Sequence, residues 1–441
     1  MLEKIFNWSK RKEEPGGTLP FIRFGRYSDN NKPIEKVDKW SQADGLFKEK
    51  KYLPSIAAFF GYLTDELEGN IVHEQKGAES TFFIYQGSKI IRGSYNETSM
   101  RAEVELASMP TPSVPVMRRL LEMNFALYYT RYTLKGDRLT MMFDTDIATA
   151  SPSKLYYGLK ELATKSDKQD DLLVADFTAL QPIDTDHVIT IPQKEKEIKY
   201  KYLQQWIKET LALVETVDAD KFSGGVAYLL LALAYRIDFL LVPEGRLLLD
   251  IEKIVEIYFR KDERAVTEKN AEMTEAFLKL QARKAEEIYP HLFRSRYTFS
   301  IVAPQNYKTV SDAIYNANQN IVWYKENKHN EIAARISEYG LSYCQYSYSL
   351  PRPVTELFQL FMMVNHPAYF EELGFATPYY NKEKNEYNRE NIIQVIDGIN
   401  ASWKNKYPGF EMRSDRLIFD SLLDFNQSFT NEIESLNMET Q

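Results

Sequence analysis

The pattern of apolar and polar positions divides the chain into a region of alternating strands and a longer region of helical periodicity. Between residues 70 and 108, four short runs, NIVHEQ, TFFIYQ, KIIRGSY and MRAEVELA, have the composition and alternation of β-strands. The Gly87-Ser88 pair suits a tight turn between the second and third runs. A further hairpin is predicted in MNFALYYTRYTLKGDRLTMMFDTDI, residues 123–147, around the turn Lys135-Gly136-Asp137-Arg138.

Helical spacing surrounds these strands. Residues 39–67 contain two helical segments around Pro54, and the second has a continuous apolar face. Further helices are expected at residues 113–123, where Ser113 can cap the first turn, and near residues 153–166. The predicted order is therefore helix, three or four strands, helix, two strands, helix.

This order of elements resembles the type III secretion chaperone-like fold, especially its YbjN-type branch, over residues 50–180. LLEMNFALYYTRYTLKGDRLTMMFDTDI followed by SKLYYGLKELATKSDKQDD is similar to the helix, hairpin and closing helix of that branch. Its members are commonly dimeric and bind other polypeptides or have no assigned activity. The resemblance implies an antiparallel sheet with helices on one face and a polypeptide partner, and it allows a homodimer.

The remainder of the chain departs from this pattern. QPIDTDHVITIPQKEKEIK, residues 181–199, is polar, contains two prolines and predicts a linker. Persistent helical spacing then predicts an all-helical domain of eight to ten helices over residues 200–441. The predicted fold class is thus α+β, with an arm at 1–36, a chaperone-like domain at 37–180, the linker and the helical domain.

The most apolar stretch is VAYLLLALAYRIDFLLV, residues 226–242. A spanning helix needs about 20 apolar residues, and the charges of Arg236 and Asp238 are costly in a bilayer. We therefore expect a buried helix and no stable membrane insertion.

Charge and cysteine content narrow the classes of function. The net charge of −8 argues against nucleic-acid binding, which needs a basic surface. The single cysteine, Cys344, fits a reducing compartment, and the amino-terminal segment lacks the continuous apolar core of a signal peptide. These features predict a cytoplasmic protein.

Motifs for catalysis are scarce in the sequence. It contains no phosphate-binding Gly-rich loop, Gly-x-Ser-x-Gly elbow or Rossmann fingerprint, and we predict no cofactor. Ser151-Pro-Ser-Lys154 matches a Ser-x-x-Lys spacing, but Ser151 stands where a helix needs a cap. Catalysis therefore has little support from sequence motifs.

Two Asp-Thr-Asp triplets, at residues 144–146 and 184–186, space carboxylates as a divalent cation would require. Such residues also occur at strand ends and turns, so we favour a structural role. The alternative hypothesis is a metal-dependent enzyme with its site between the two domains and Asp184, Asp186 and His187 as ligands.

Aromatic side chains supply the remaining signal, with 29 Tyr and 25 Phe in the chain. Residues 338–363, EYGLSYCQYSYSLPRPVTELFQLFMM, concentrate Tyr and Met, which suit adaptable recognition, although packing in a core is favoured. The leading hypothesis is a protein-binding or chaperone-like protein without catalysis. Its candidate contact residues are Tyr128, Tyr132 and Met142 on the hairpin, and Tyr343, Tyr346 and Tyr348.

Overall fold

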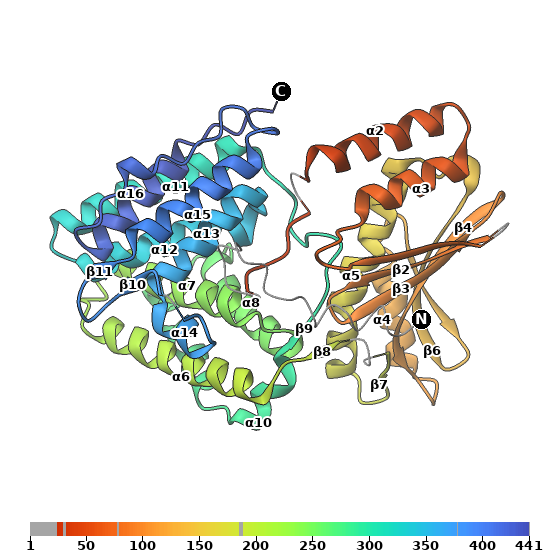
Figure 1. The fold of residues 1–441 in the computed structure, drawn as a ribbon. Helices are drawn as coiled ribbons and strands as arrows, with labels where there is room; N and C mark the ends of the chain where they lie inside the picture. The colour runs from red at the N-terminus through yellow and green to blue at the C-terminus, as the bar shows by residue number, and fades with distance from the viewer. Residues whose placement is uncertain (1–23, 30–31, 77–78, 185–187, 377, 441) are drawn as a thin grey trace.

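The computed structural model describes residues 24–29, 32–76, 79–184, 188–376 and 378–440, and the two domains lie side by side (Figure 1). The N-terminal domain is α+β and the C-terminal domain is mostly helical, which confirms the predicted fold class. The N-terminal elements follow the predicted order: α2 (Ile34–Lys48), α3 (Tyr52–Leu63), β1 (Ile71–Lys76), β2 (Glu79–Gln86), β3 (Lys89–Tyr95), β4 (Ser99–Ser108), α4 (Val114–Asn124), β5 (Arg131–Lys135), β6 (Arg138–Asp146), the 3₁₀ turn η2 (Ile147–Thr149), α5 (Pro152–Asp176) and β7 (Gln181–Pro182).

The strands form one antiparallel sheet in the order β1-β2-β3-β4-β6-β5, with β7 paired to β4. Both predicted turns are present, and glycine is required in each because Gly87 and Gly136 have φ values of +54° and +64°. One sheet face packs on α3, α4 and α5 around a single apolar core. The other face carries charged pairs, among them Arg131 with Asp144.

Helix α5 lies close against the sheet because residue 158 has no side chain. A Cβ atom at Gly158 would lie 2.5 Å from the ring of Phe143 on β6. Ser151 caps the helix by accepting a hydrogen bond from the Lys154 backbone N–H at 3.3 Å, as its position in the sequence predicts. The helix runs ten residues beyond its predicted end, because its last turns contact other parts of the protein. Asp167 accepts a hydrogen bond from the Ser88 N–H of the β2–β3 turn at 2.8 Å, and Lys168 lies 3.7 Å from Glu252 of the helical domain.

The described residues of the C-terminal domain form eleven α-helices, where eight to ten were expected. Two of the eleven are very short: α10 (Ala285–Ile288) has four residues and α14 (Pro367–Glu372) has six. The segment predicted as a linker, residues 181–199, contains β7, β8 (Ile189–Thr190) and the first turns of α6 (Gln193–Glu215). The elements are β8 (Ile189–Thr190), α6 (Gln193–Glu215), α7 (Ser223–Arg236), the π-helix η3 (Ile237–Leu241), α8 (Gly245–Phe259), α9 (Val266–Gln281), α10 (Ala285–Ile288), η4 (Tyr289–His291), β9 (Phe293–Arg294), α11 (Tyr307–Glu326), α12 (Asn330–Tyr348), α13 (Arg352–Asn365), α14 (Pro367–Glu372), β10 (Tyr380–Asn381), β11 (Glu386–Tyr387), α15 (Arg389–Trp403), η5 (Ser414–Arg416) and α16 (Leu422–Glu434).

One helix among the described residues, Ser223–Leu241, is long and apolar enough to cross a bilayer. In this structure 89% of its most apolar window is buried inside the protein. Both of its charged residues have internal partners: Arg236 Nε lies 2.6 Å from Glu338, and Asp238 lies 2.6 Å from Arg26.

Two segments cross between the domains. The first consists of residues 24–29 of the predicted arm, and the name arm is used below for these residues alone. It runs between the two domains (Figure 1) and places Phe24 in the helical core. The second is the crossing segment, residues 295–300, which places Phe299 in the N-terminal core with no exposed surface. Asp29 and Ser300 join the two segments, because the Ser300 N–H donates to Asp29 Oδ1 at 3.0 Å. Each domain therefore contributes a segment that packs into the core of the other domain, and these contacts hold the domains together in addition to the covalent chain.

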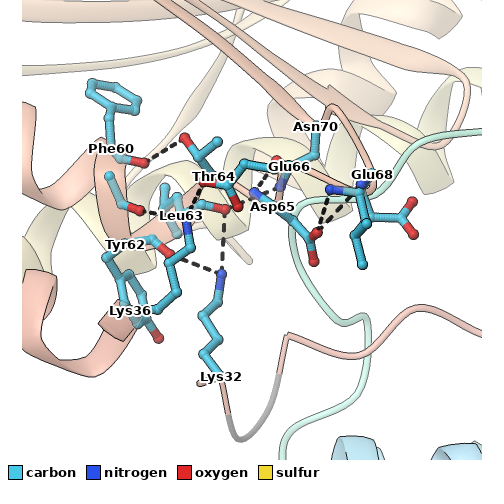
Figure 2. A network of polar contacts seen from close by, with 12 residues as sticks. Lys32, Lys36, Phe60, Tyr62, Leu63, Thr64, Asp65, Glu66, Glu68 and Asn70 are labelled. Atoms are coloured by element: carbon cyan, nitrogen blue, oxygen red, sulfur yellow. Dashed lines mark hydrogen bonds and ion pairs between the residues drawn. The ribbon is translucent and has the colours of Figure 1, made fainter. Parts of the chain in front are cut away.

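The turn after α3 is fixed by polar contacts (Figure 2). Lys32 Nζ donates to the carbonyl oxygens of Tyr62 and Leu63 at 3.2 and 3.3 Å, where the helix end favours a cation. Asn70 Oδ1 accepts the N–H of Asp65 at 2.8 Å. Asp65 also forms an ion pair with Arg352 of α13, so this turn is tied to the helical domain.

Candidate functional site

An exposed apolar line follows the outer side of α4. Val114, Leu121 and Phe125 recur at helical spacing and are 64%, 66% and 93% exposed. Arg118 shares this line and is also exposed. The opposite side of the helix is buried in the core, so α4 carries a second apolar line that no other described element covers.

The loop after α4 continues this surface and is held in place by one carboxylate. Glu161 of α5 accepts the backbone N–H groups of Tyr128, Tyr129 and Thr130 at 2.8 to 2.9 Å. Tyr128, whose backbone is held in this way, is 91% exposed. A fixed, exposed cluster of large apolar side chains is typical of a contact surface.

Strand β5 lies beside this loop and forms one edge of the sheet. The N–H of Tyr132 points away from β6 and donates to Asn124 Oδ1 at 2.9 Å, which blocks that end of the edge. The other end presents Leu134, which is 47% exposed. We call the combined surface the α4–β5 face and define it by Val114, Arg118, Leu121, Phe125, Tyr128, Tyr129 and Leu134.

Of the three hairpin residues predicted from the sequence, the structure places one on this face. Tyr128 belongs to it, whereas Tyr132 and Met142 are only 8% and 7% exposed. The register pairs Tyr132 with Met141 and Arg131 with Met142, so Tyr132 and Met142 point to opposite sides of the sheet. The three do not form one surface, because Tyr128 precedes the strand and its alternation does not continue into β5.

The predicted tyrosines of α12 pack on the helical core, far from the α4–β5 face in the fold. Tyr343 and Tyr348 share a hydrogen bond of 3.1 Å between their hydroxyls. The ring of Tyr346 lies 5.0 Å from that of Tyr235 and 5.1 Å from the Arg26 guanidinium. These contacts favour a packing role for the tyrosine cluster.

A cavity of about 470 Å³ lies between the domains. The arm, the turn after α3, the connection from the π-helix to α8, the crossing segment and α13 contribute to its walls. Its volume falls in the range of small-molecule sites, which is roughly 300 to 1,000 Å³. Sequence reasoning placed a site between the domains only as part of the metal hypothesis.

Glu244 and Tyr297 are two polar residues of this cavity that sequence reasoning missed. Glu244 is 4% exposed, and both of its carboxylate oxygens accept from the Tyr297 hydroxyl, at 2.7 and 2.9 Å. Burial raises the pKa of Glu244 to about 7, although the hydrogen bond from Tyr297 opposes the rise. The signal in the sequence was Val-Pro-Glu-Gly after the apolar run, where Val242 and Gly245 adopt positive φ and turn the chain.

The residues of the metal hypothesis do not assemble into a site among the described residues. Both carboxylate oxygens of Asp184 are held by Arg92, at 2.5 and 2.7 Å. Asp186 and His187 lie outside the described residues. Within the described ranges, no group of three or more His, Cys, Asp or Glu side chains is placed to bind a metal ion.

The chain was also compared with known proteins. No protein-family model matches it, and no curated protein matches its sequence. The resemblance to the secretion chaperone-like fold rests on the order of the elements and stays an expectation.

Proposed function

We propose that this chain is a protein-binding, chaperone-like protein whose N-terminal domain contacts another polypeptide through the α4–β5 face. The observation that carries the proposal is the fixed exposure of Phe125 and Tyr128. Burial of a large aromatic side chain in a core or interface is favourable, and these two side chains do not have that stabilisation while they are exposed to water. Glu161 binds the backbone of the loop that carries Tyr128.

The chemistry of the face indicates the kind of partner. Arg118 lies between Val114 and Leu121 on the exposed line and makes no ion pair among the described residues. A partner segment with apolar side chains and a carboxylate opposite Arg118 complements this arrangement. The resemblance to a family whose members bind polypeptides points the same way, and a second copy of the chain is the homodimeric form of the proposal.

The experiment compares partner retention by the full-length protein and by variants purified from its own host. The double variant Leu121→Ser/Phe125→Ser removes the centre of the face. The matched control, Tyr315→Ser/Trp323→Ser, removes two exposed aromatic side chains of α11 in the other domain.

We expect quantitative mass spectrometry to show a co-purifying protein that is reduced about tenfold in the first variant and unchanged in the control. Arg118→Glu should also reduce it, and light scattering reports a dimer of the chain itself. A monomer that retains no protein sensitive to the face variant contradicts the proposal.

A further inference from the structure

The cavity between the domains has an unusual distribution of charge. The cations that line it are each paired with a carboxylate of the protein. Arg26 pairs with Asp238, and Arg352 pairs with Asp65. Lys199 and Arg294 share the carboxylate of Glu195, at 3.4 and 2.9 Å. These cations are therefore already neutralised, wholly or in part, by groups of the wall.

Glu244 differs from Asp65 and Asp238, the wall carboxylates that pair with arginines. Glu356 of α13 also lines the cavity without an ion pair among the described residues, but it accepts the indole N–H of Trp403 at 3.0 Å. No ion pair joins Glu244 to a cation among the described residues, and its hydrogen-bond partner is the neutral phenol of Tyr297. A buried carboxylate without a cation is costly, so it either takes up a proton or binds a positive charge. Glu244 faces a cavity large enough to admit a molecule that carries such a charge.

Apolar side chains line the same cavity. Leu248 comes from α8, Phe293 from β9 and Val302 from the chain after the crossing segment. Apolar side chains together with a small number of convergent polar groups are the usual composition of a small-molecule site.

We propose that the interdomain cavity binds a small organic cation, a primary amine or amidinium on an apolar body, whose charged group pairs with Glu244. The apolar body contacts Leu248, Phe293 and Val302. This site is separate from the α4–β5 face.

The proposal gives the binding a pH dependence. Because burial raises the pKa of Glu244 to about 7, this carboxyl group is mostly protonated and uncharged at lower pH, and it then no longer attracts a cation. A cation therefore binds more tightly at about pH 8 than at about pH 6. The titratable and charged groups that face Glu244 are Asp167 and Asp171 of α5, Tyr297 of the crossing segment, Arg26 of the arm, Lys199 of α6 and His291 of η4.

The test uses calorimetry on the full-length protein with three probes of similar shape. These are 2-phenylethylamine, the neutral 2-phenylethanol and the anionic 3-phenylpropionate. We expect the amine to bind best at about pH 8 and to lose about tenfold in affinity in Glu244→Gln, while the alcohol is unaffected. The control Glu275→Gln changes a carboxylate on the surface of α9, and Leu121→Ser/Phe125→Ser changes the α4–β5 face; both should bind the amine as the wild type does.

Two further measurements keep the test independent of how Glu244→Gln folds. The wild-type protein alone should bind the amine more tightly as the pH rises. Tyr297→Phe removes the donor that stabilises the Glu244 carboxylate, so amine binding should weaken near neutral pH and recover at higher pH. Tighter binding of the propionate, amine affinity that is independent of pH, or no binding of any probe at millimolar concentration would overturn the proposal.

Discussion

The carboxylate of Glu161 on α5 accepts the backbone N–H of Tyr128 at 2.9 Å, although the two residues are 33 positions apart. The same carboxylate accepts the N–H groups of Tyr129 and Thr130 and the hydroxyl of Thr130. A single side chain of α5 therefore determines the conformation of the loop that carries the most exposed aromatic residues of the N-terminal domain.

Replacing Glu161 should loosen this loop. Glu161→Ala leaves three N–H groups without their acceptor, and we expect a loss of about 1 to 3 kcal/mol in the free energy of unfolding. Urea denaturation measures the loss, and chymotrypsin should cleave faster after Phe125 or Tyr128. Glu122→Ala, which removes an exposed carboxylate of α4, is the control. Equal stability and equal cleavage in the two variants would argue against the role given to Glu161.

The buried ion pair of the helical domain should be sensitive to the loss of one partner. Arg236 and Glu338 are 3% and 0% exposed in their side chains and lie 2.6 Å apart. Arg236→Met leaves the Glu338 carboxylate buried without its main cation, and we expect a loss of about 3 to 5 kcal/mol. The double variant Arg236→Met/Glu338→Leu should be milder, because the buried carboxylate and its main cation are removed together, and Arg335, which also pairs with Glu338, is 34% exposed in its side chain. Chemical denaturation of both variants checks this order, and a more stable single variant would contradict it.

Glu244 should give the stability of the protein a pH dependence of defined sign. Burial raises its pKa to about 7 in the folded protein, from 4.5 for an ordinary glutamate. The folded state holds this proton more tightly, so the stabilisation is complete below about pH 4.5 and is lost as the pH rises to about 7.

The free energy of unfolding of the wild-type protein, minus that of Glu244→Gln, should therefore fall by about 3 kcal/mol between about pH 4.5 and about pH 7. Urea denaturation at a series of pH values measures the difference between the two proteins. A difference that stays constant, or that grows with pH, is inconsistent with a buried carboxyl of raised pKa.

The crossing segment should couple the unfolding of the two domains. Phe299 has no exposed surface and packs in the N-terminal core, whereas its neighbour Ile301 is 48% exposed. Phe299→Ala should cost about 3 to 5 kcal/mol and separate the thermal transitions of the domains, because the anchor of the segment is lost. Ile301→Ala should change little. Calorimetry that shows one unchanged transition for Phe299→Ala would refute the coupling.

The N-terminal domain was predictable because its signals are local. Strand alternation, the glycines at positions 87 and 136, and the cap at Ser151 each act within a few residues, and the structure confirms them. Alternation failed for Tyr132 and Met142, because the loop before β5 is not extended and the side of the sheet that faces the core depends on register.

The contacts between the domains could not be read from local pattern. Phe24 packs against Phe239 and Phe370, and Phe299 packs among strands more than 200 residues earlier in the chain. The polar end of α5 resembles a solvent-exposed helix in sequence, yet Asp167 is half-buried against the β2–β3 turn, and desolvation there raises its pKa. Glu244 was missed for the same reason, since its partner Tyr297 is 53 residues away.

Site-specific photo-cross-linking in the host tests the central claim most directly. A benzoylphenylalanine in place of Tyr128 lies on the α4–β5 face, and one in place of Tyr315 on α11 is equally compatible with an exposed position. We predict a discrete cross-linked polypeptide from position 128 that is absent from position 315 and disappears in the Leu121→Ser/Phe125→Ser background. No cross-link from position 128, or the same products from both positions, would contradict a contact surface on the α4–β5 face.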